Sequence, residues 1–121
     1  MGNCSKSFAA AALMSAILST PVIADTAGIQ GTVKRTLVQP DGAFGGCMAL
    51  LSVDPASALP SCSPHWVTFS CTGDFADVLA AYRSFDQAQL ALAGNHQVYV
   101  QIDDGRKHNG YCYAYRIDVL K

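Results

Sequence analysis

The sequence predicts an α+β protein that is mostly β: a five-stranded antiparallel OB-like barrel or curled sheet, with one helix between the third and fourth strands. All nine acidic residues are Asp, which favours caps and turns, and none is Glu, which favours helix interiors. Short segments of alternating apolar and polar residues recur, separated by Gly and Pro. A single segment combines helical apolar spacing with clear start and stop signals. A helix packed on an open antiparallel sheet remains an alternative.

Three strands are expected before the helix. The first lies near Ile29 to Val38 and ends at the turn sequence Pro40-Asp41-Gly42. The second, Cys47 to Val53, is a continuous apolar run. After a loop rich in Pro and Ser, the third strand, His65 to Cys71, alternates between two faces.

The helix is expected over Phe85 to Ala93. Ser84 and Gln87 have the spacing of a capping box, and Gly94-Asn95 is a typical helix end. The preceding segment, Gly73 to Arg83, fits either a helix or a loop, because its apolar residues have helical spacing but Thr-Gly-Asp opens it like a turn.

Two alternating strands follow the helix, over His96 to Asp103 and Tyr111 to Leu120. The polar stretch "DGRKHNG" between them contains glycines and Asn109, which tolerate positive φ, so it predicts the loop of an antiparallel hairpin.

The N-terminal residues are expected to be a signal peptide over residues 1–24, followed by a single disulfide-stabilised domain over residues 25–121. Phe8 to Ser19 is an apolar run too short to span a bilayer, and Ala24 fits the last position before a signal-peptidase cut. Cys4 precedes the apolar run, which argues against a lipid anchor. The protein is therefore expected to be periplasmic or secreted, without membrane insertion.

Without its leader, the chain has 7 basic and 9 acidic residues, a net charge of 7 − 9 = −2. A nucleic-acid partner is therefore not expected, because such partners select basic surfaces. Four cysteines remain, Cys47, Cys62, Cys71 and Cys112, an even number that predicts two disulfides in an exported chain. Strand register favours Cys47–Cys71 with Cys62–Cys112, and Cys47–Cys62 with Cys71–Cys112 is nearly as well supported.

The hairpin carries the candidate ligand-binding residues. Charged, amide and aromatic side chains on a loop held by a rigid hairpin are typical of recognition sites. The candidates are Asp104, Arg106, Lys107, His108, Asn109, Tyr111 and Tyr113. Trp66 with Tyr111, Tyr113 and Tyr115 is a candidate sugar-stacking platform, although the tyrosines fit one face of a sheet better.

Catalytic and metal-ligating patterns are weak. Asp103, Asp104 and His108 contain the groups for acid–base chemistry, but turn acids capping backbone amides beside a solvated histidine are the favoured interpretation. His65, His96 and His108 lack a ligand spacing, so no metal and no cofactor is expected.

The segments "HWVTFSC", "AQLALA" and "VYVQIDDGRKHNGYCYAYRID" resemble a family of small exported bacterial proteins of unknown function. The resemblance covers Trp66 to Asp118 and implies location and domain identity rather than chemistry. The order of strands and helix is also similar to that of the OB-fold B subunits of bacterial toxins, in architecture only, since no sugar-site motif is shared.

The sequence therefore predicts a small exported disulfide-bonded protein that acts as a non-enzymatic binding module for a glycan or a protein surface. Two alternatives stay open. One is a subunit of an oligomeric toxin-like assembly, with homo-oligomer formation. The other is a small hydrolase that uses Asp and His.

Overall fold

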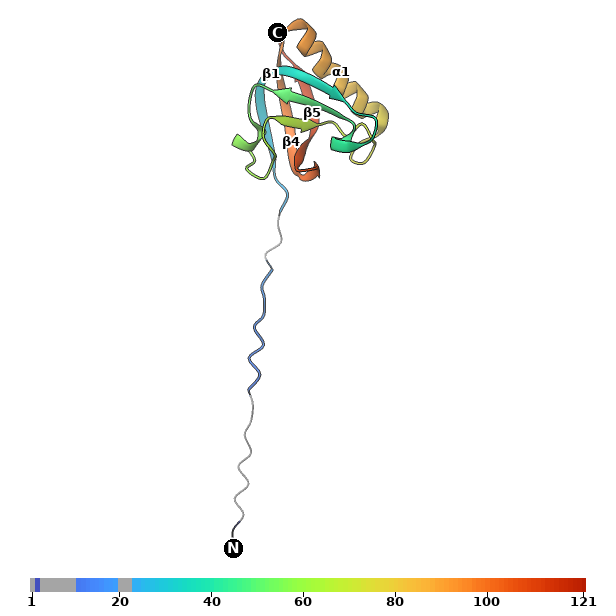
Figure 1. Cartoon of the computed structure of the whole chain (residues 1–121). Coiled ribbons are helices and arrows are strands. Elements are labelled where there is room, and N and C mark those ends of the chain that lie inside the picture. Colours follow the sequence, from blue (N-terminus) through green and yellow to red (C-terminus); the bar gives the residue numbers. More distant parts are fainter. Residues whose placement is uncertain (1, 3–10, 20–22) are drawn as a thin grey trace.

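The computed structural model describes residues 2, 11–19 and 23–121. Residues 8–10 of the predicted apolar leader, Phe8 to Ser19, lie outside the described residues. Val22, near the predicted cleavage position, also lies outside them. Residues 11–19 form neither helix nor strand and extend away from the folded part of the chain (Figure 1). Within the described residues, no helix has the length and apolar character needed to cross a membrane.

The folded part is mostly β, with one α-helix and five strands in the predicted order (Figure 1). A short 3-10 helix, η1, precedes the second strand, and another, η2, follows it. The elements are β1 (Thr26–Val38), η1 (Ala43–Gly45), β2 (Cys47–Leu51), η2 (Pro55–Ser57), β3 (Trp66–Thr68), α1 (Val78–Gly94), β4 (Gln97–His108) and β5 (Tyr111–Val119).

The five strands form one mixed sheet whose hydrogen-bonded order, β1-β2-β3-β5-β4, closes on itself because β1 also pairs with β4. The expectation of a purely antiparallel sheet is wrong at one place, since β3 and β5 are parallel. The reason is geometric. Two antiparallel pairings separate β3 from β1, and two separate β5 from β1 through β4, so β3 and β5 run in the same direction.

Strand β1 is long enough to join both halves of the sheet. Residues 26–32 pair with β4, and residues 33–38 pair with β2. The register shifts between Val33 and Arg35, so Lys34 is an extra residue opposite β2. Such a bulge bends and twists a strand, which allows β1 to leave one neighbour and join the other.

A second bulge lies in β5. Gln101 pairs with Arg116 and Ile102 pairs with Ala114, which leaves Tyr115 unpaired. The extra residue reverses which side chains face the core. Cys112 and Ala114 belong to the core before it, and Ile117 packs against the core after it. The tyrosine stripe is therefore not a single sheet face.

The predicted hairpin loop is largely strand. β4 continues to His108, and the turn consists of Asn109 and Gly110, both with positive φ. Between the pairs Asp103–Tyr113 and Lys107–Cys112, residues 104–106 are extra on β4 and bulge out of the ladder.

The helix is longer than predicted and the third strand shorter. Asp77 is the N-cap, and its carboxylate accepts the Ala80 N–H at 3.3 Å, so α1 begins in the segment that the sequence left ambiguous. The capping-box interpretation of Ser84 was wrong because Asp77 supplies an earlier cap. Asn95, with φ 54°, ends the helix as expected.

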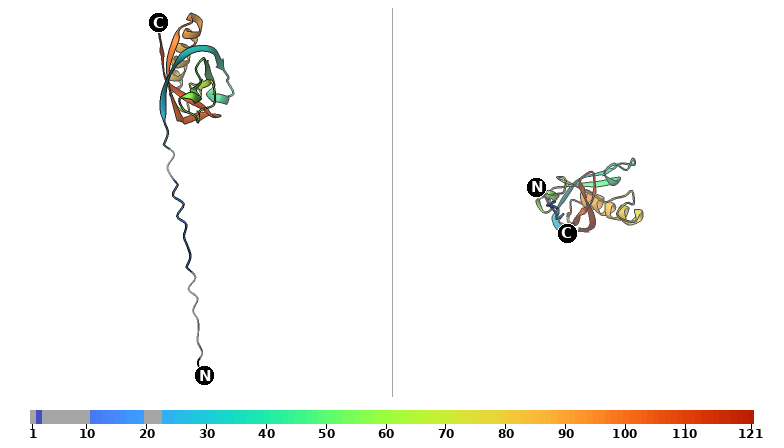
Figure 2. Two further views of the ribbon diagram at one scale, coloured as in Figure 1. Left: turned by 90° about the vertical axis from the view of Figure 1, so that its left-hand side faces the viewer. Right: turned by 90° about the horizontal axis from the view of Figure 1, so that it is seen from below.

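The core lies between α1 and the inner face of the sheet, which the helix crosses on one side (Figures 1 and 2). Ala81, Phe85, Ala88 and Ala91 are the buried residues of the helix. The two disulfides are Cys47–Cys71 and Cys62–Cys112, with Cα separations of 5.6 and 5.4 Å, which confirms the first of the two pairings considered. They are compatible with a small secreted disulfide-bonded protein.

Candidate functional site

An open hollow of about 200 Å³ lies on the outer face of β1, β2 and β3, and the η1 turn and the first residue of β5 complete its rim. Its lining is mainly apolar and aromatic, with one cation. The lining residues are Arg35, Leu37, Phe44, Met48, Trp66 and Tyr111.

Strand register explains why this outer face is apolar. Leu37 pairs with Met48, which places both side chains on the same side of the sheet. Alternate residues of β2, such as Ala49 and Leu51, belong to the core. The continuous apolar run of β2 therefore supplies two faces, one for the core and one for the hollow.

The aromatic groups of the hollow contact one another and the cation. The Arg35 guanidinium carbon lies 5.9 Å from the Trp66 ring centroid. Phe44 and Tyr111 meet edge to face at a centroid distance of 5.7 Å. Arg35 is exposed, and in the described part of the chain it forms no ion pair with a carboxylate.

Strained backbone borders the hollow. Phe44 has φ 58°, an uncommon conformation for a bulky side chain, and Gly42, Gly45 and Gly46 around it also have positive φ. His65, next to Trp66, has φ 68°. Such residues persist only where their surroundings impose the conformation, and they concentrate at functional sites.

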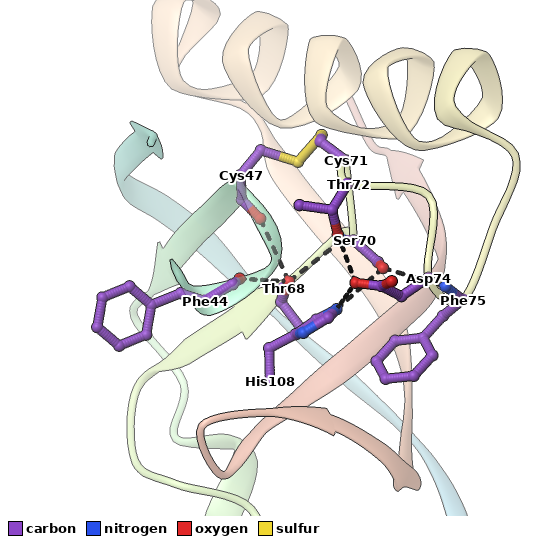
Figure 3. Close-up of a disulfide and its surroundings, with 9 residues drawn as sticks. All are labelled: Phe44, Cys47, Thr68, Ser70, Cys71, Thr72, Asp74, Phe75 and His108. Atoms are coloured by element: carbon purple, nitrogen blue, oxygen red, sulfur yellow. Dashed lines mark hydrogen bonds and ion pairs between the residues drawn. A yellow bond between two sulfur atoms is a disulfide. The ribbon is translucent and has the colours of Figure 1, made fainter. Parts of the chain in front are cut away.

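A hydrogen-bond network joins the η1 turn to β3 and to the end of β4 (Figure 3). The Thr68 hydroxyl donates to the Phe44 carbonyl at 2.8 Å and accepts the Ser70 N–H at 3.2 Å. The Ser70 hydroxyl lies 3.0 Å from His108 Nε2 and accepts the Phe75 N–H at 3.2 Å. The network therefore connects the end of β4 to the backbone that presents Phe44.

Ser70, His108 and Asp74 have the composition of a hydrolytic triad but not its geometry. Asp74 Oδ2 lies 3.7 Å from His108 Nε2, the same ring nitrogen that Ser70 contacts, whereas a triad acid orients the opposite nitrogen. Ser70 is also fully buried. Its hydroxyl therefore cannot reach a substrate, and the cluster has a structural role in this conformation.

The predicted site residues fall into separate places rather than one site. Of the seven candidates on the hairpin, only Tyr111 lines the hollow, where it joins Trp66 of the proposed stacking platform. His108 is directed to Ser70, and its side chain is 15% exposed, so the expectation of a solvated histidine is wrong. Asn109 is exposed at the turn. Within the described chain, no hydrogen bond or ion pair joins His108 to Asp103 or Asp104.

Arg106 and Tyr113 form a second group on the hairpin. The guanidinium carbon of Arg106 lies 4.6 Å from the Tyr113 ring centroid, and its Nε donates to Asp103 Oδ2 at 2.8 Å. Burial raises the pKa of the Tyr113 hydroxyl, and the nearby charge of Arg106 opposes this rise. Arg106 is thus already engaged by Asp103 and by the Tyr113 ring, so these contacts stabilise the hairpin rather than form an open binding site.

Asp104 and Lys107 form a third group, near the start of β1. Asp104 Oδ1 accepts the Asp25 N–H at 2.7 Å, and Oδ2 accepts the Ser61 hydroxyl at 2.9 Å. The Asp25 N–H, followed by the Ser61 hydroxyl, lowers the pKa of this carboxyl. Lys107 Nζ donates to the Ser61 carbonyl at 2.9 Å.

Among the residues that the structure describes, no three His, Cys, Asp or Glu side chains lie together as a metal site would require. Sequence reasoning named Trp66 and Tyr111 as aromatic candidates but missed the rest of the hollow, Arg35, Leu37, Phe44 and Met48. The available signals were the two-faced apolar run of β2 and an aromatic residue inside the glycine-rich turn "DGAFGG".

Comparison of the chain with protein-family models, with curated proteins and with solved structures finds no significant match. The resemblance to small exported proteins therefore stays a prediction.

Proposed function

We propose that this chain is an exported, non-enzymatic binding module of the OB type, and that its hollow binds one sugar residue of a glycan. The observation that carries the proposal is the hollow itself. Three aromatic side chains and Arg35, which has no ion pair in the described chain, converge on an otherwise apolar surface whose residues lie outside the main core cluster.

The strand order supports the OB assignment. A five-stranded sheet that closes in the order β1-β2-β3-β5-β4, with a helix between β3 and β4, has the arrangement of an OB fold. OB folds bind oligonucleotides or oligosaccharides on the face of strands 2 and 3, between the loops that follow strands 1 and 4. The hollow is bordered by β2, β3, the η1 turn after β1 and the first residue of β5, and this agreement in position supports the proposal. The net charge of 7 − 9 = −2 after residue 24 favours a sugar over a polyanionic strand.

The chemistry of the lining also suits a sugar. Aromatic rings such as Trp66 offer flat apolar surface to the C–H faces of a pyranose, and Arg35 offers several N–H donors to hydroxyl or carboxylate oxygens. The volume of about 200 Å³ is below the roughly 300–1,000 Å³ of pockets for drug-sized ligands. It therefore fits one residue of a glycan, whose remaining residues extend into solvent.

The test uses the only tryptophan of the chain, Trp66, as a reporter. We expect the purified protein to bind members of a glycan array and the bound glycan to change the tryptophan emission. Arg35→Ala and Trp66→Ala are expected to lose binding. Tyr115→Ala, which removes an exposed aromatic side chain outside the hollow, is the matched control and should bind normally. Absence of glycan binding, or equal binding by all variants, contradicts the proposal.

A second candidate, the subunit of an oligomeric toxin-like assembly, is favoured by one observation. Several apolar side chains of α1 are exposed, including Leu79 at 61% and Leu90 at 55%. Light scattering of the purified protein distinguishes this candidate from a monomeric binder, because an assembly has a molar mass several times that of one chain.

A further inference from the structure

The start of β1 is held by Asp104, well outside the hollow. The Asp25 N–H donates to Asp104 Oδ1 at 2.7 Å, and the Asp104 N–H donates back to the Asp25 carbonyl at 3.0 Å. Asp25 thus continues the pairing of β1 with β4 by one residue beyond Thr26 and Asp103. Its backbone nitrogen has a carboxylate as its partner, rather than the carbonyl typical of a strand.

The Asp104 carboxylate lies in a bulge, has a fixed orientation and is ionised, which are the properties of a counter-ion. The bulge at residues 104–106 takes Asp104 out of the ladder with β5. Its second oxygen is already bound to the Ser61 hydroxyl, which fixes the orientation of the carboxylate. The hydrogen bonds from Asp25 and Ser61 lower its pKa, so Asp104 is ionised at neutral pH.

We propose that Asp104 is the counter-ion of the α-ammonium group that forms when the leader is removed after Ala24. Hydrolysis of the Ala24–Asp25 peptide bond by a signal peptidase consumes one water. The new carboxylate leaves with Ala24, and the amine stays on Asp25 and takes up a proton. An amide N–H that donates one hydrogen bond becomes a positively charged group with three donors, 2.7 Å from a carboxylate oxygen.

The surroundings of Ala24 agree with removal at this bond. Ala24 is exposed and borders a second hollow with Ser61, Asp104, Gly105 and Lys107. The Ala24 methyl group lies against Gly105, so a side chain added at position 105 would collide with that methyl group. Departure of Ala24 therefore opens space beside Asp104 for the ammonium group, and no residue of the sheet is lost, since β1 begins at Thr26. The described residues that directly precede β1, 23–25, lead away from the fold at this end of the strand (Figures 1 and 2).

The ion pair between Asp104 and the α-ammonium group of Asp25 therefore forms only after cleavage at Ala24–Asp25. A cut that leaves extra residues places the new amine away from Asp104, and a later cut removes the backbone N–H that Asp104 binds. The inference depends on the proposed export but not on glycan binding, because none of the residues of the aromatic hollow takes part.

The first experiment exports the full chain from a bacterial host and identifies the N-terminus of the product by intact mass and N-terminal sequencing. A product that begins at Asp25, with 121 − 24 = 97 residues, is expected. A product that begins at any other residue overturns the inference. Glycan binding by either product is measured separately, which separates failure of this inference from failure of the proposed function.

The second experiment measures acylation of the α-amine of the processed protein at pH 7 by an amine-reactive reagent, read by mass spectrometry of the N-terminal peptide. Only the uncharged amine reacts, and a partner carboxylate favours the ammonium form. Asp104→Asn is expected to react about threefold faster, as for an exposed ion pair of modest strength. Asp118→Asn, which removes a distant surface carboxylate paired with Arg116, should react at the wild-type rate. Equal rates for Asp104→Asn and wild type refute the pair.

Other charged side chains lie near this end of β1, and both variants retain them. They are Asp25 itself, Asp103, whose carboxylate accepts the Gly105 N–H, and Lys107, which donates to the Ser61 carbonyl. If Asp104→Asn does not fold, carbon NMR of the wild-type carboxylates replaces it. The Asp104 carboxyl signal is expected to shift as the α-amine titrates, and the Asp118 signal is not. A flat Asp104 signal is evidence against the pair.

Discussion

His108 Nε2 lies 3.0 Å from the buried hydroxyl oxygen of Ser70. This contact joins the last residue of β4 to the loop that follows β3, two segments 38 residues apart. The His108 ring also packs on Phe75, with a centroid distance of 4.5 Å. A residue that the sequence suggested as part of a solvated loop is therefore an anchor between the hairpin and the rest of the fold.

His108→Ala is expected to destabilise the protein. The substitution removes one hydrogen bond and leaves the buried Ser70 hydroxyl without its imidazole partner, which costs about 1–3 kcal/mol. The free energy of unfolding, measured by chemical denaturation, should fall by that amount. His96→Ala is the matched control, because His96 forms no side-chain hydrogen bond among the described residues. Equal free energies of unfolding for the two variants would show that the contact between His108 and Ser70 does not contribute to stability.

Phe44→Gly is expected to separate stability from binding. Glycine adopts the positive φ of this position freely, which relieves roughly 1–3 kcal/mol of backbone strain. Loss of the edge contact with Tyr111 offsets about 0.5–1.5 kcal/mol of this gain, and loss of packing offsets more. The melting temperature should change little while glycan binding falls, because the hollow loses one wall.

A neighbouring substitution provides the contrast. A methyl group at Gly45 would lie 2.5 Å from both His108 Cδ2 and Thr68 Oγ1, at a position with φ 78°. Gly45→Ala is therefore expected to lower stability as well as binding. A Phe44→Gly variant that unfolds like Gly45→Ala would contradict a functional origin for the strained phenylalanine.

Removal of either disulfide is expected to cost about 3–4 kcal/mol by the chain-entropy estimate. The loop between Cys62 and Cys112 spans 50 residues and that between Cys47 and Cys71 spans 24. The Cys62–Cys112 disulfide should therefore contribute more to the free energy of unfolding. The two double Cys→Ala variants, compared by chemical denaturation, test this order. A wild-type protein whose melting temperature does not change on reduction would exclude a major role for both bonds.

The sequence predicted the elements better than their edges. Element order, the single helix and the number of disulfides follow from periodicity and cysteine count, which are local signals. The choice between the two disulfide pairings depended on one strand register, and the sequence left both pairings open. The helix start was missed because two cap sequences compete, and Asp77 wins by adding two turns that bury Ala81. The parallel pairing of β3 with β5 was missed because it depends on closure of the whole sheet.

The candidate site was harder to predict because bulges change which side chains share a face. A single extra residue, Tyr115, reverses the alternation of β5, and three extra residues take Asp104 out of the ladder. Neither bulge contains a proline or another strong sequence signal, apart from Gly105. The hollow also joins residues from four separate segments, so no local pattern contains more than two or three of its walls.

Acid is expected to destabilise the protein partly through Asp54. Its Oδ1 accepts the Ala56 N–H at 2.9 Å and the His65 N–H at 3.2 Å. The Ala56 bond, followed by the His65 bond, lowers the pKa of Asp54. A carboxyl with a lowered folded-state pKa contributes stability above its unfolded pKa of about 3.9 and loses it as pH falls through the lower folded value.

Asp54→Asn should therefore melt below the wild type at pH 6, and the two melting temperatures should converge as pH falls from about 4 toward 2. The amide oxygen still accepts a hydrogen bond, so the difference reports the charge. Asp86→Asn is the matched control, since Asp86 is exposed on α1 and should leave the pH profile unchanged. A difference between Asp54→Asn and wild type that stays constant down to pH 2 would assign the effect to packing rather than to ionisation of Asp54.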